Sequence, residues 1–206
     1  MHYPVQLIRV NETLSLYLPI PTDIRPVYEK SIQAVPETPF PFWARVWPSS
    51  RALTTFLEQN KELVKGKQVL EIGAGTGLPS FSVAPTAASV IISDHAPDAV
   101  ELMKKNISFL GLANVKAMCL DWNQIPEELK ADTVLLSDIN YAPDQFGPLI
   151  KLIHRFLEKE STVVIATPQR IMGISFAEQL SPFIVQQEEL IAEETRISLF
   201  VLAKAE

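Results

Sequence analysis

Two hydrophobic patterns alternate along the chain from residue 48 onward. Short runs rich in valine, isoleucine and leucine predict buried strands, and longer stretches with apolar residues at helical spacing predict amphipathic helices. The first helix is expected to begin under a serine cap, at Ser49 or Ser50, and to continue to about Asn60. The strand-like runs cover residues 68–73, 89–94, 115–122, 132–138, 161–168, 184–192 and 195–204, and the other helical stretches cover residues 96–111, 146–159 and 174–183.

The order of these elements predicts the fold class. Strands that alternate with helices form βαβ crossovers, which place successive strands parallel in one sheet. The last two strands have only Glu193, Glu194 and their neighbours between them, too few residues for a helix, so this pair is expected to be antiparallel. The sequence therefore predicts an α/β fold with a doubly wound, mainly parallel seven-stranded sheet that ends in a C-terminal antiparallel hairpin.

Residues 1–41 differ from the rest of the chain. Two short strand-like runs, QLIRV and TLSLYLP, surround Asn11 and Glu12 and predict a hairpin, and a connector interrupted by prolines follows them. We expect residues 1–41 to be an N-terminal extension that lies on a single domain formed by residues 42–206.

Composition narrows the class of protein. A chain of 206 residues with 47% hydrophobic and 20% charged residues is typical of one globular domain, and a net charge of −6 argues against nucleic acid as a partner. One cysteine, Cys119, excludes an internal disulfide and is expected to be a small buried hydrophobe, and the three histidines lack metal-ligand spacing. No leader pattern or membrane-spanning run is present, so we expect a cytoplasmic monomer with no metal and no membrane partner.

The strongest chemical signal is the segment VLEIGAGTGLP at residues 69–79. It follows a predicted strand and precedes a helix, where glycines let a ligand approach the backbone closely. No Gly-Lys-Ser/Thr follows, which excludes a phosphate-binding P-loop, and glycines at positions 73, 75 and 77 do not fit the dinucleotide pattern GxGxxG. By itself the segment could also be a tight connection without a ligand.

Polar residues at the ends of neighbouring predicted strands favour the ligand. Asp94 ends the second strand of the regular region about 20 residues after the glycines, where a carboxylate can accept hydrogen bonds from the ribose hydroxyls of a nucleoside. Asp121 and Trp122 end the third strand, and the indole could flank an adenine ring. Glu71 could orient the glycine turn or meet a ligand amine. The sequence thus predicts a nucleoside site at the carboxyl edge of the sheet.

The combination of motifs resembles a known family. ExGxGxG, an acidic residue at the end of the next strand and a final antiparallel hairpin are the pattern of seven-stranded S-adenosylmethionine-dependent methyltransferases with a Rossmann-like fold. More narrowly, WPSS, VLEIGAGTGLPS, LDW and SDINY resemble the lysine methyltransferase-like group known as methyltransferase family 16. PFWARVWPSSRAL is especially similar to the electron-transfer-flavoprotein β-subunit lysine methyltransferases. The resemblance covers about residues 40–170.

The resemblance implies S-adenosyl-L-methionine as cofactor and a lysine-containing protein as substrate. It adds two cofactor contacts, Trp47 beside the methionine portion and Ser137 at the end of the fourth strand. The full set of expected cofactor residues is Trp47, Glu71, Gly73, Ala74, Gly75, Asp94, Trp122 and Ser137. The motif DxxY supplies the expected catalytic residues, Asp138 and Tyr141, which would accept hydrogen bonds from the substrate amine and orient its lone pair.

Three questions stay open at this point. Trp43 could be a second wall of the site or a core residue, and Arg170 could contact substrate or be solvated. The turn at residues 167–169 lacks the glycines of the most similar relatives, which leaves substrate choice open. A small-molecule N-methyltransferase, favoured by a lid from residues 1–41, and a non-catalytic S-adenosylmethionine-binding module are the alternative functions.

Overall fold

The computed structural model describes residues 4–20, 40–140, 143–169 and 174–204. A small antiparallel sheet, β1 (Val5–Arg9) and β2 (Ser15–Pro19), precedes a seven-stranded sheet. The strands of the larger sheet are β3 (Gln68–Ile72), β4 (Ser89–Asp94), β5 (Val115–Cys119), β6 (Thr133–Ser137), β7 (Thr162–Pro168), β8 (Ile184–Ala192) and β9 (Thr195–Leu202). The helices are α2 (Pro48–Gln59), α3 (Leu78–Val83), α4 (Pro97–Leu110), α5 (Phe146–Glu158) and α6 (Ile174–Leu180).

The large sheet is doubly wound, as the element order predicts. Its strand order is β5-β4-β3-β6-β7-β9-β8, and β3 pairs in parallel with both β4 and β6. β9 is antiparallel to both β7 and β8. The chain therefore leaves β3 in one direction along the sheet and later returns to its other side, which makes the carboxyl end of β3 a topological switch point. The predicted fold class and the C-terminal antiparallel hairpin are confirmed.

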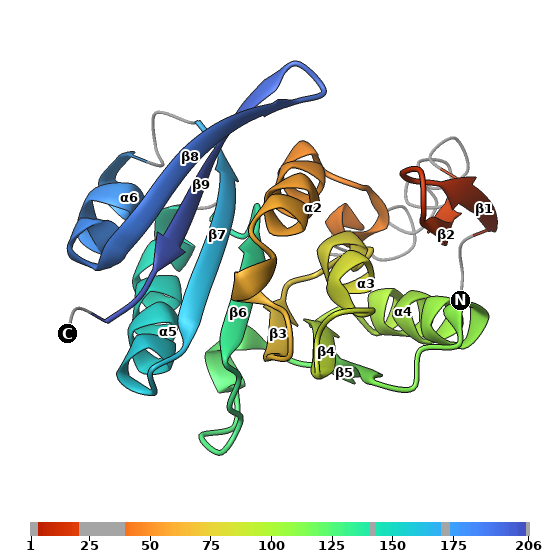
Figure 1. Ribbon diagram of the computed structural model, residues 1–206, viewed down its shortest axis with the longest axis horizontal. Helices are drawn as coiled ribbons and strands as arrows, with labels where there is room; N and C mark the ends of the chain where they lie inside the picture. Colours follow the sequence, from red (N-terminus) through yellow and green to blue (C-terminus); the bar gives the residue numbers. More distant parts are fainter. Residues whose placement is uncertain (1–3, 21–39, 141–142, 170–173, 205–206) are drawn as a thin grey trace.

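Side chains that alternate along the strands divide the core into two layers. On β3, Val69 belongs to a buried cluster with α2, α3 and α4, whereas Leu70 belongs to a second cluster with α5 and α6. Figure 1 shows these two groups of helices on the two sides of the sheet. Because both faces of the parallel strands are covered, the strands are almost continuously apolar rather than alternating with polar residues.

The N-terminal hairpin packs against α4, as Figure 1 shows, and shares its core. Leu14, Leu16 and Leu18 are buried in the same cluster as the apolar face of α4. Asn106, which is fully buried on α4, accepts a hydrogen bond from the Tyr17 N–H at 2.7 Å and donates one to the Tyr17 carbonyl at 3.0 Å. Both backbone polar groups of Tyr17 thus tie the hairpin to α4, in addition to its packing on the core.

Three local predictions were wrong. No serine side chain caps α2, because Pro48 occupies the first helical position with Trp47 as N-cap. β5 ends at Cys119 rather than at residue 122, because the Asp121 carboxylate accepts the Asn123 N–H at 2.9 Å and starts a 3₁₀ turn (Trp122–Gln124). Cys119 is exposed, since β5 lies at the edge of the sheet.

Within the described ranges, no helix has the length and apolar character needed to cross a bilayer.

Candidate functional site

A cleft of about 720 Å³ lies at the carboxyl edge of the sheet, at the switch point next to β3. Its volume falls within the range of about 300–1,000 Å³ that is usual for small-molecule sites. Residues from four strand ends and from the segment before α2 line it. They are Phe40, Pro41, Phe42, Trp43, Arg45, Trp47, Ser50, Gly73, Ala74, Gly75, Thr76, Asp94, His95, Ala96, Pro97, Asp98, Trp122, Ser137, Asp138 and Ile139.

The glycine turn after β3 forms the floor of this cleft and needs glycine for two reasons. Gly73 and Gly75 have φ angles of 63° and 56°, in the left-handed region that disfavours other residues. A Cβ atom on Gly73 would lie 2.9 Å from Ile139 Cγ2 and 3.5 Å from the Trp122 ring. A Cβ atom on Gly75 would lie 3.1 Å from the carbonyl oxygen of Trp43. The turn is therefore enclosed on both sides by residues that line the cleft.

Asp94 links the glycine turn to the start of α4. Its Oδ2 accepts the Gly75 N–H and its Oδ1 accepts the Ala96 N–H, both at 2.9 Å, and the side chain is buried. A carboxylate has capacity for further hydrogen bonds beyond these two, so it can still receive ligand hydroxyls. The same carboxylate hydrogen-bonds His95, 3.4 Å away, and thereby raises the pKa of that exposed imidazole.

Glu71 lies beneath the turn and not in the lining of the cleft. It is fully buried, and its Oε2 accepts the Ser80 N–H at 3.0 Å near the start of α3. Burial raises its pKa to about 7, while the hydrogen bonds with Ser80 act in the opposite direction. Of the two roles considered from the sequence, this position favours orienting the loop over meeting a ligand amine.

An aromatic segment ahead of α2 lines one side of the cleft. Trp47 is held by a hydrogen bond from its Nε1 to the Phe42 carbonyl at 2.9 Å, and the Arg45 guanidinium lies 4.9 Å from the centre of its ring. Trp43 lines the cleft and also packs against the core cluster of α2 to α4. Trp43 is therefore both a wall of the cleft and a residue packed on the core, the two roles considered from the sequence. Trp47 is a wall of the cleft.

The end of β6 brings the predicted acidic residue into the cleft. Asp138 has a φ angle of 52°, which is unusual outside glycine and tolerated best by Asp and Asn, and its N–H donates to the Ala166 carbonyl at 2.9 Å. Two residues later, buried Asn140 accepts a hydrogen bond from the Thr167 hydroxyl at 2.7 Å. A non-glycine residue held in this conformation by neighbouring bonds is a common feature of functional sites.

The structure brings most of the predicted site residues together. Trp47, Gly73, Ala74, Gly75, Asp94, Trp122, Ser137 and Asp138 all line the one cleft, and Glu71 supports it from below. Tyr141 and Arg170 lie outside the described residues. Sequence reasoning did not select Arg45, Ser50, Thr76 or Ile139 for the site; each lies within one of the quoted motifs, but nothing beyond that membership marks it.

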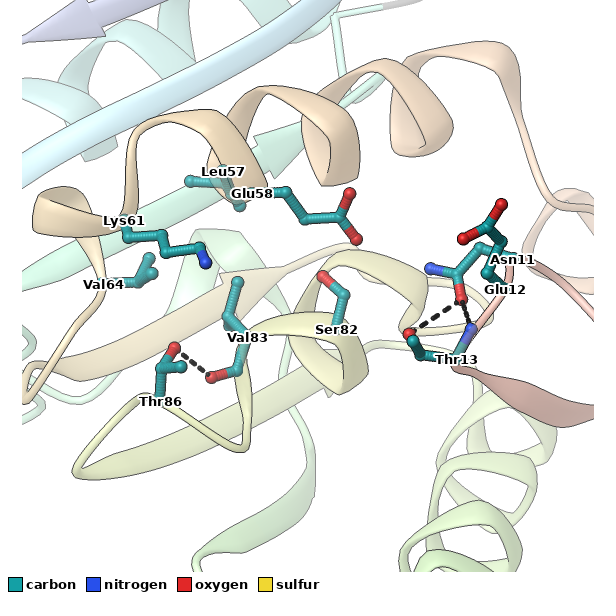
Figure 2. A pocket seen from close by; sticks show the side chains of 10 residues that line it. All are labelled: Asn11, Glu12, Thr13, Leu57, Glu58, Lys61, Val64, Ser82, Val83 and Thr86. Atoms are coloured by element: carbon teal, nitrogen blue, oxygen red, sulfur yellow. Dashed lines mark hydrogen bonds between the residues drawn. The ribbon is translucent and has the colours of Figure 1, made fainter.

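A second hollow, of about 480 Å³, lies between the turn after β1, the end of α2 and α3 (Figure 2). Its polar groups bond locally, for example Thr13 Oγ1 to Asn11 Oδ1 at 3.2 Å and Thr86 Oγ1 to the Val83 carbonyl at 3.1 Å. None of the sequence motifs contributes to its lining. Across the described ranges, no group of three or more His, Cys, Asp or Glu side chains gathers as metal ligands.

Comparison with known protein families gives one match over most of the chain. A family model described as lysine methyltransferase matches residues 37–188. Histone-arginine methyltransferase METTL23 of Mus musculus is 27% identical over 164 residues, which are 77% of this chain and 62% of that protein. Calmodulin-lysine N-methyltransferase of Arabidopsis thaliana is 33% identical over 135 residues, 60% of this chain and 44% of the relative. The chain thus spans less than two thirds of either relative.

Solved structures agree on the fold. N-methyltransferase NodS of Bradyrhizobium japonicum, in complex with S-adenosyl-L-homocysteine, superposes with a TM-score of 0.67 at 14% identity, over 86% of this chain and 98% of that one. Trm5b of Pyrococcus abyssi gives a TM-score of 0.64 at 16% identity, over 98% of this chain and 56% of that one. At these identities the likeness shows the fold alone, and it confirms the Rossmann-like methyltransferase fold.

Proposed function

Because the chain belongs to the lysine methyltransferase family, we propose that it transfers a methyl group from S-adenosylmethionine to a lysine side chain of a protein. The observation that carries the proposal is the single cleft that joins the glycine turn, Asp94 and Asp138 at the switch point of the sheet. The narrower resemblance to the electron-transfer-flavoprotein β-subunit enzymes stays a prediction, because the relatives above carry other names.

The residues of the cleft fit the cofactor. Because Gly73 has no side chain, Ile139 and Trp122 pack closely on the turn that lines the cleft, and Asp94 retains acceptor capacity for ligand hydroxyls. Asp94 would bind the ribose hydroxyls, Trp122 would flank the adenine, and Trp47 and Ser137 would border the methionine portion, with Gly73, Ala74 and Gly75 as the floor. When bound, S-adenosylmethionine supplies the methyl group as an electrophilic carbon on a positively charged sulfur.

Asp138 would prepare the nucleophile. A lysine amine has a pKa near 10.4 and is mostly protonated at neutral pH, so the site must favour loss of a proton and direct the lone pair. The Asp138 carboxylate lines the cleft on a backbone fixed by the bond to Ala166, so it can accept hydrogen bonds from the amine in a set orientation. We assign Tyr141 of the same motif as its partner in this role.

The position of the N-terminal hairpin supports a protein substrate over a small molecule. Residues 4–20 contribute nothing to the lining of the cleft and pack on α4 instead, so the hairpin does not form a lid. Of the other described residues in the range 1–41, Phe40 and Pro41 line the cleft. Phe40 and Phe42, which do line the cleft, are 38% and 55% exposed and leave an apolar rim at its entrance. Such a rim is suited to the surface of a protein that presents one side chain.

The nitrogen acceptor is proposed from the family description. Two of the relatives are named for methylation of histone arginine and of calmodulin lysine. A third, from Aspergillus fumigatus and 30% identical over 143 residues, is named for methylation of protein N-termini and lysine. These names share a protein nitrogen as acceptor, and lysine is the one that the family description gives. Division at residue 41, a cytoplasmic location and a monomeric state without a nucleic-acid partner stay predictions.

The test combines methyl labelling with cofactor binding. Purified protein is incubated with S-adenosylmethionine labelled on its methyl group and a cell lysate, beside the variants Asp138→Asn and Asp144→Asn. Asparagine tolerates the left-handed backbone of position 138, and Asp144 is an exposed carboxylate outside the cleft, so the two exchanges are matched. We expect a labelled protein band that Asp138→Asn weakens a hundredfold or more, roughly the contribution of a general base, with S-adenosylhomocysteine affinity retained.

Other outcomes separate the alternatives. Label on arginine or on an N-terminal amine of the band would replace lysine as the acceptor. Label only in the small-molecule fraction would replace the protein substrate with a metabolite. Binding of S-adenosylhomocysteine without any transfer of label would favour a non-catalytic binding module.

A further inference from the structure

The charges that line the cleft are unbalanced. Three carboxylates, Asp94, Asp98 and Asp138, face it, whereas Arg45 is the only lysine or arginine among its described lining residues. His95 lines it too, but its Nδ1 faces the Asp94 carboxylate at 3.4 Å. An anionic group that entered this cleft would meet repulsion from the carboxylates unless it lay next to Arg45.

Among the described residues, Arg45 is positioned without an acidic partner. Its guanidinium lies 4.9 Å from the centre of the Trp47 ring, and the hydrogen bond to the Phe42 carbonyl fixes that ring. Within the described part of the chain, no carboxylate lies within ion-pair distance of Arg45. Stacking on an indole holds the planar group and leaves its N–H edge available for a second ligand.

The surroundings of Arg45 favour a small anion inside the cleft. Trp47 is the N-cap of α2, so the first turn of this 12-residue helix directs its positive end to the same region, where Ser50 also lines the cleft. A guanidinium matches a carboxylate through two parallel hydrogen bonds. Arg45 and the start of α2 thus form a local positive region in an otherwise acidic cleft.

We propose that Arg45 binds the α-carboxylate of the methionine portion of the cofactor. The assignment rests on the proposed function, which puts the nucleoside at Asp94 and the methionine portion at Trp47. Arg45 then neutralises the one anionic group of S-adenosylmethionine at a point away from Asp94, Asp98 and Asp138. It is a cofactor-binding residue and takes no part in the transfer itself.

The test compares two ligands by calorimetry. S-adenosylhomocysteine carries the amine and the carboxylate, whereas S-adenosyl-3-thiopropylamine keeps the amine and lacks the carboxylate. The variants are Arg45→Met, which keeps an apolar stem over Trp47, and Arg45→Lys, which keeps the charge. Arg196→Met is the matched control, because Arg196 is an exposed arginine that lies outside the cleft and pairs with Glu189.

We expect Arg45→Met to weaken S-adenosylhomocysteine binding roughly tenfold, because it removes a partly exposed, charge-assisted pair with the ligand carboxylate. Binding of the decarboxylated ligand, which cannot form this pair, should change less than about twofold. Arg45→Lys should recover part of the loss, and Arg196→Met should change neither affinity. An equal loss for both ligands would overturn the proposal, since it would mean that Arg45 only supports Trp47. No loss for either would overturn it as well. Failure of the unmodified protein to bind either ligand would reject the cofactor assignment, and the proposal with it.

Discussion

Replacing Gly73 by alanine tests whether the glycine turn is shaped by the cleft or only by its backbone. Gly111, the C-cap of α4, is a close control because its φ of 65° nearly equals the 63° of Gly73, and nothing lies within 4 Å of a Cβ placed there. A left-handed backbone costs a non-glycine residue about 1–2 kcal/mol. Alanine also lowers the conformational entropy of the unfolded chain, which offsets part of this cost, so Gly111→Ala should lower the free energy of unfolding by about 1 kcal/mol.

Gly73→Ala carries the same strain and an added clash. Its Cβ would lie 2.9 Å from Ile139 Cγ2, well inside the optimal carbon separation of about 3.5–4.0 Å, and Ile139 is buried, so moving it would disturb its packing. Overpacking of this kind adds about 1–3 kcal/mol, so we expect a total loss of about 2–4 kcal/mol. The same atom would be in ordinary contact with the Trp122 ring, 3.5 Å away, but the displacement of Ile139 in the cleft lining should weaken S-adenosylhomocysteine binding roughly tenfold or more.

The assay is urea unfolding of both variants, followed by calorimetric titration with S-adenosylhomocysteine. Gly111→Ala should bind the ligand as the unmodified protein does, and its urea midpoint should fall by the amount that corresponds to a loss of about 1 kcal/mol. The reasoning is refuted if the two variants lose the same stability, or if Gly73→Ala binds the ligand with unchanged affinity. Either result would mean that Ile139 and Trp122 move aside and that the turn needs glycine only for its backbone.

Three further changes test the supports around the site. Folding raises the pKa of Glu71 from 4.5 to about 7, so stability on the order of 3 kcal/mol is present below pH 4.5 and is lost as the pH rises to about 7. Glu71→Gln should remove this dependence of the unfolding free energy on pH. Urea unfolding at a series of pH values would contradict the prediction if the unfolding free energies of both proteins changed equally with pH. Asn106→Ala should cost about 2 kcal/mol in unfolding free energy by releasing both bonds to Tyr17, with unchanged S-adenosylhomocysteine affinity; a loss in affinity would show that the hairpin supports the cleft. Thr167→Val, which is isosteric, leaves the side-chain Oδ1 of Asn140 without its donor and should slow methyl transfer several-fold at unchanged cofactor affinity. The reverse pattern, weaker binding at an unchanged rate, would reject a positioning role.

The architecture could be predicted from the sequence because hydrophobic residues follow different spacings in strands and in helices, and the chain changes clearly from one spacing to the other. It predicted all seven strands of the large sheet and the antiparallel ending. It also selected Gly73 and Asp94 for one edge of the sheet, since parallel strands align their carboxyl ends, and the family resemblance added Asp138 at the same edge. It did not predict where β5 ends, because the Asp121 side chain competes for the backbone with the sheet.

Contacts between segments that are distant in the sequence could not be predicted from it. Arg45 has no motif spacing of its own, and it enters the site only because the segment before α2 folds over the glycine turn. The bond from Thr167 to Asn140 joins residues from two neighbouring strand ends, and no local pattern marks either partner. The left-handed backbone of Asp138 occurs together with the hydrogen bond from its N–H to the Ala166 carbonyl of the neighbouring strand, a contact that no local pattern marks. These contacts form only when the sheet has folded and brought the strand ends together.

The position of β9 has a consequence for synthesis on the ribosome. β9 is the last of the described strands to be translated, yet it lies between β7 and β8 in the sheet. Until residues 195–202 have left the exit tunnel, β7 has an unpaired edge next to the buried Val163 and Ile165, and β8 has no described strand to pair with. A nascent chain stalled in that interval exposes an apolar strand edge, which is a target for chaperones and a hazard for aggregation between neighbouring polysomes.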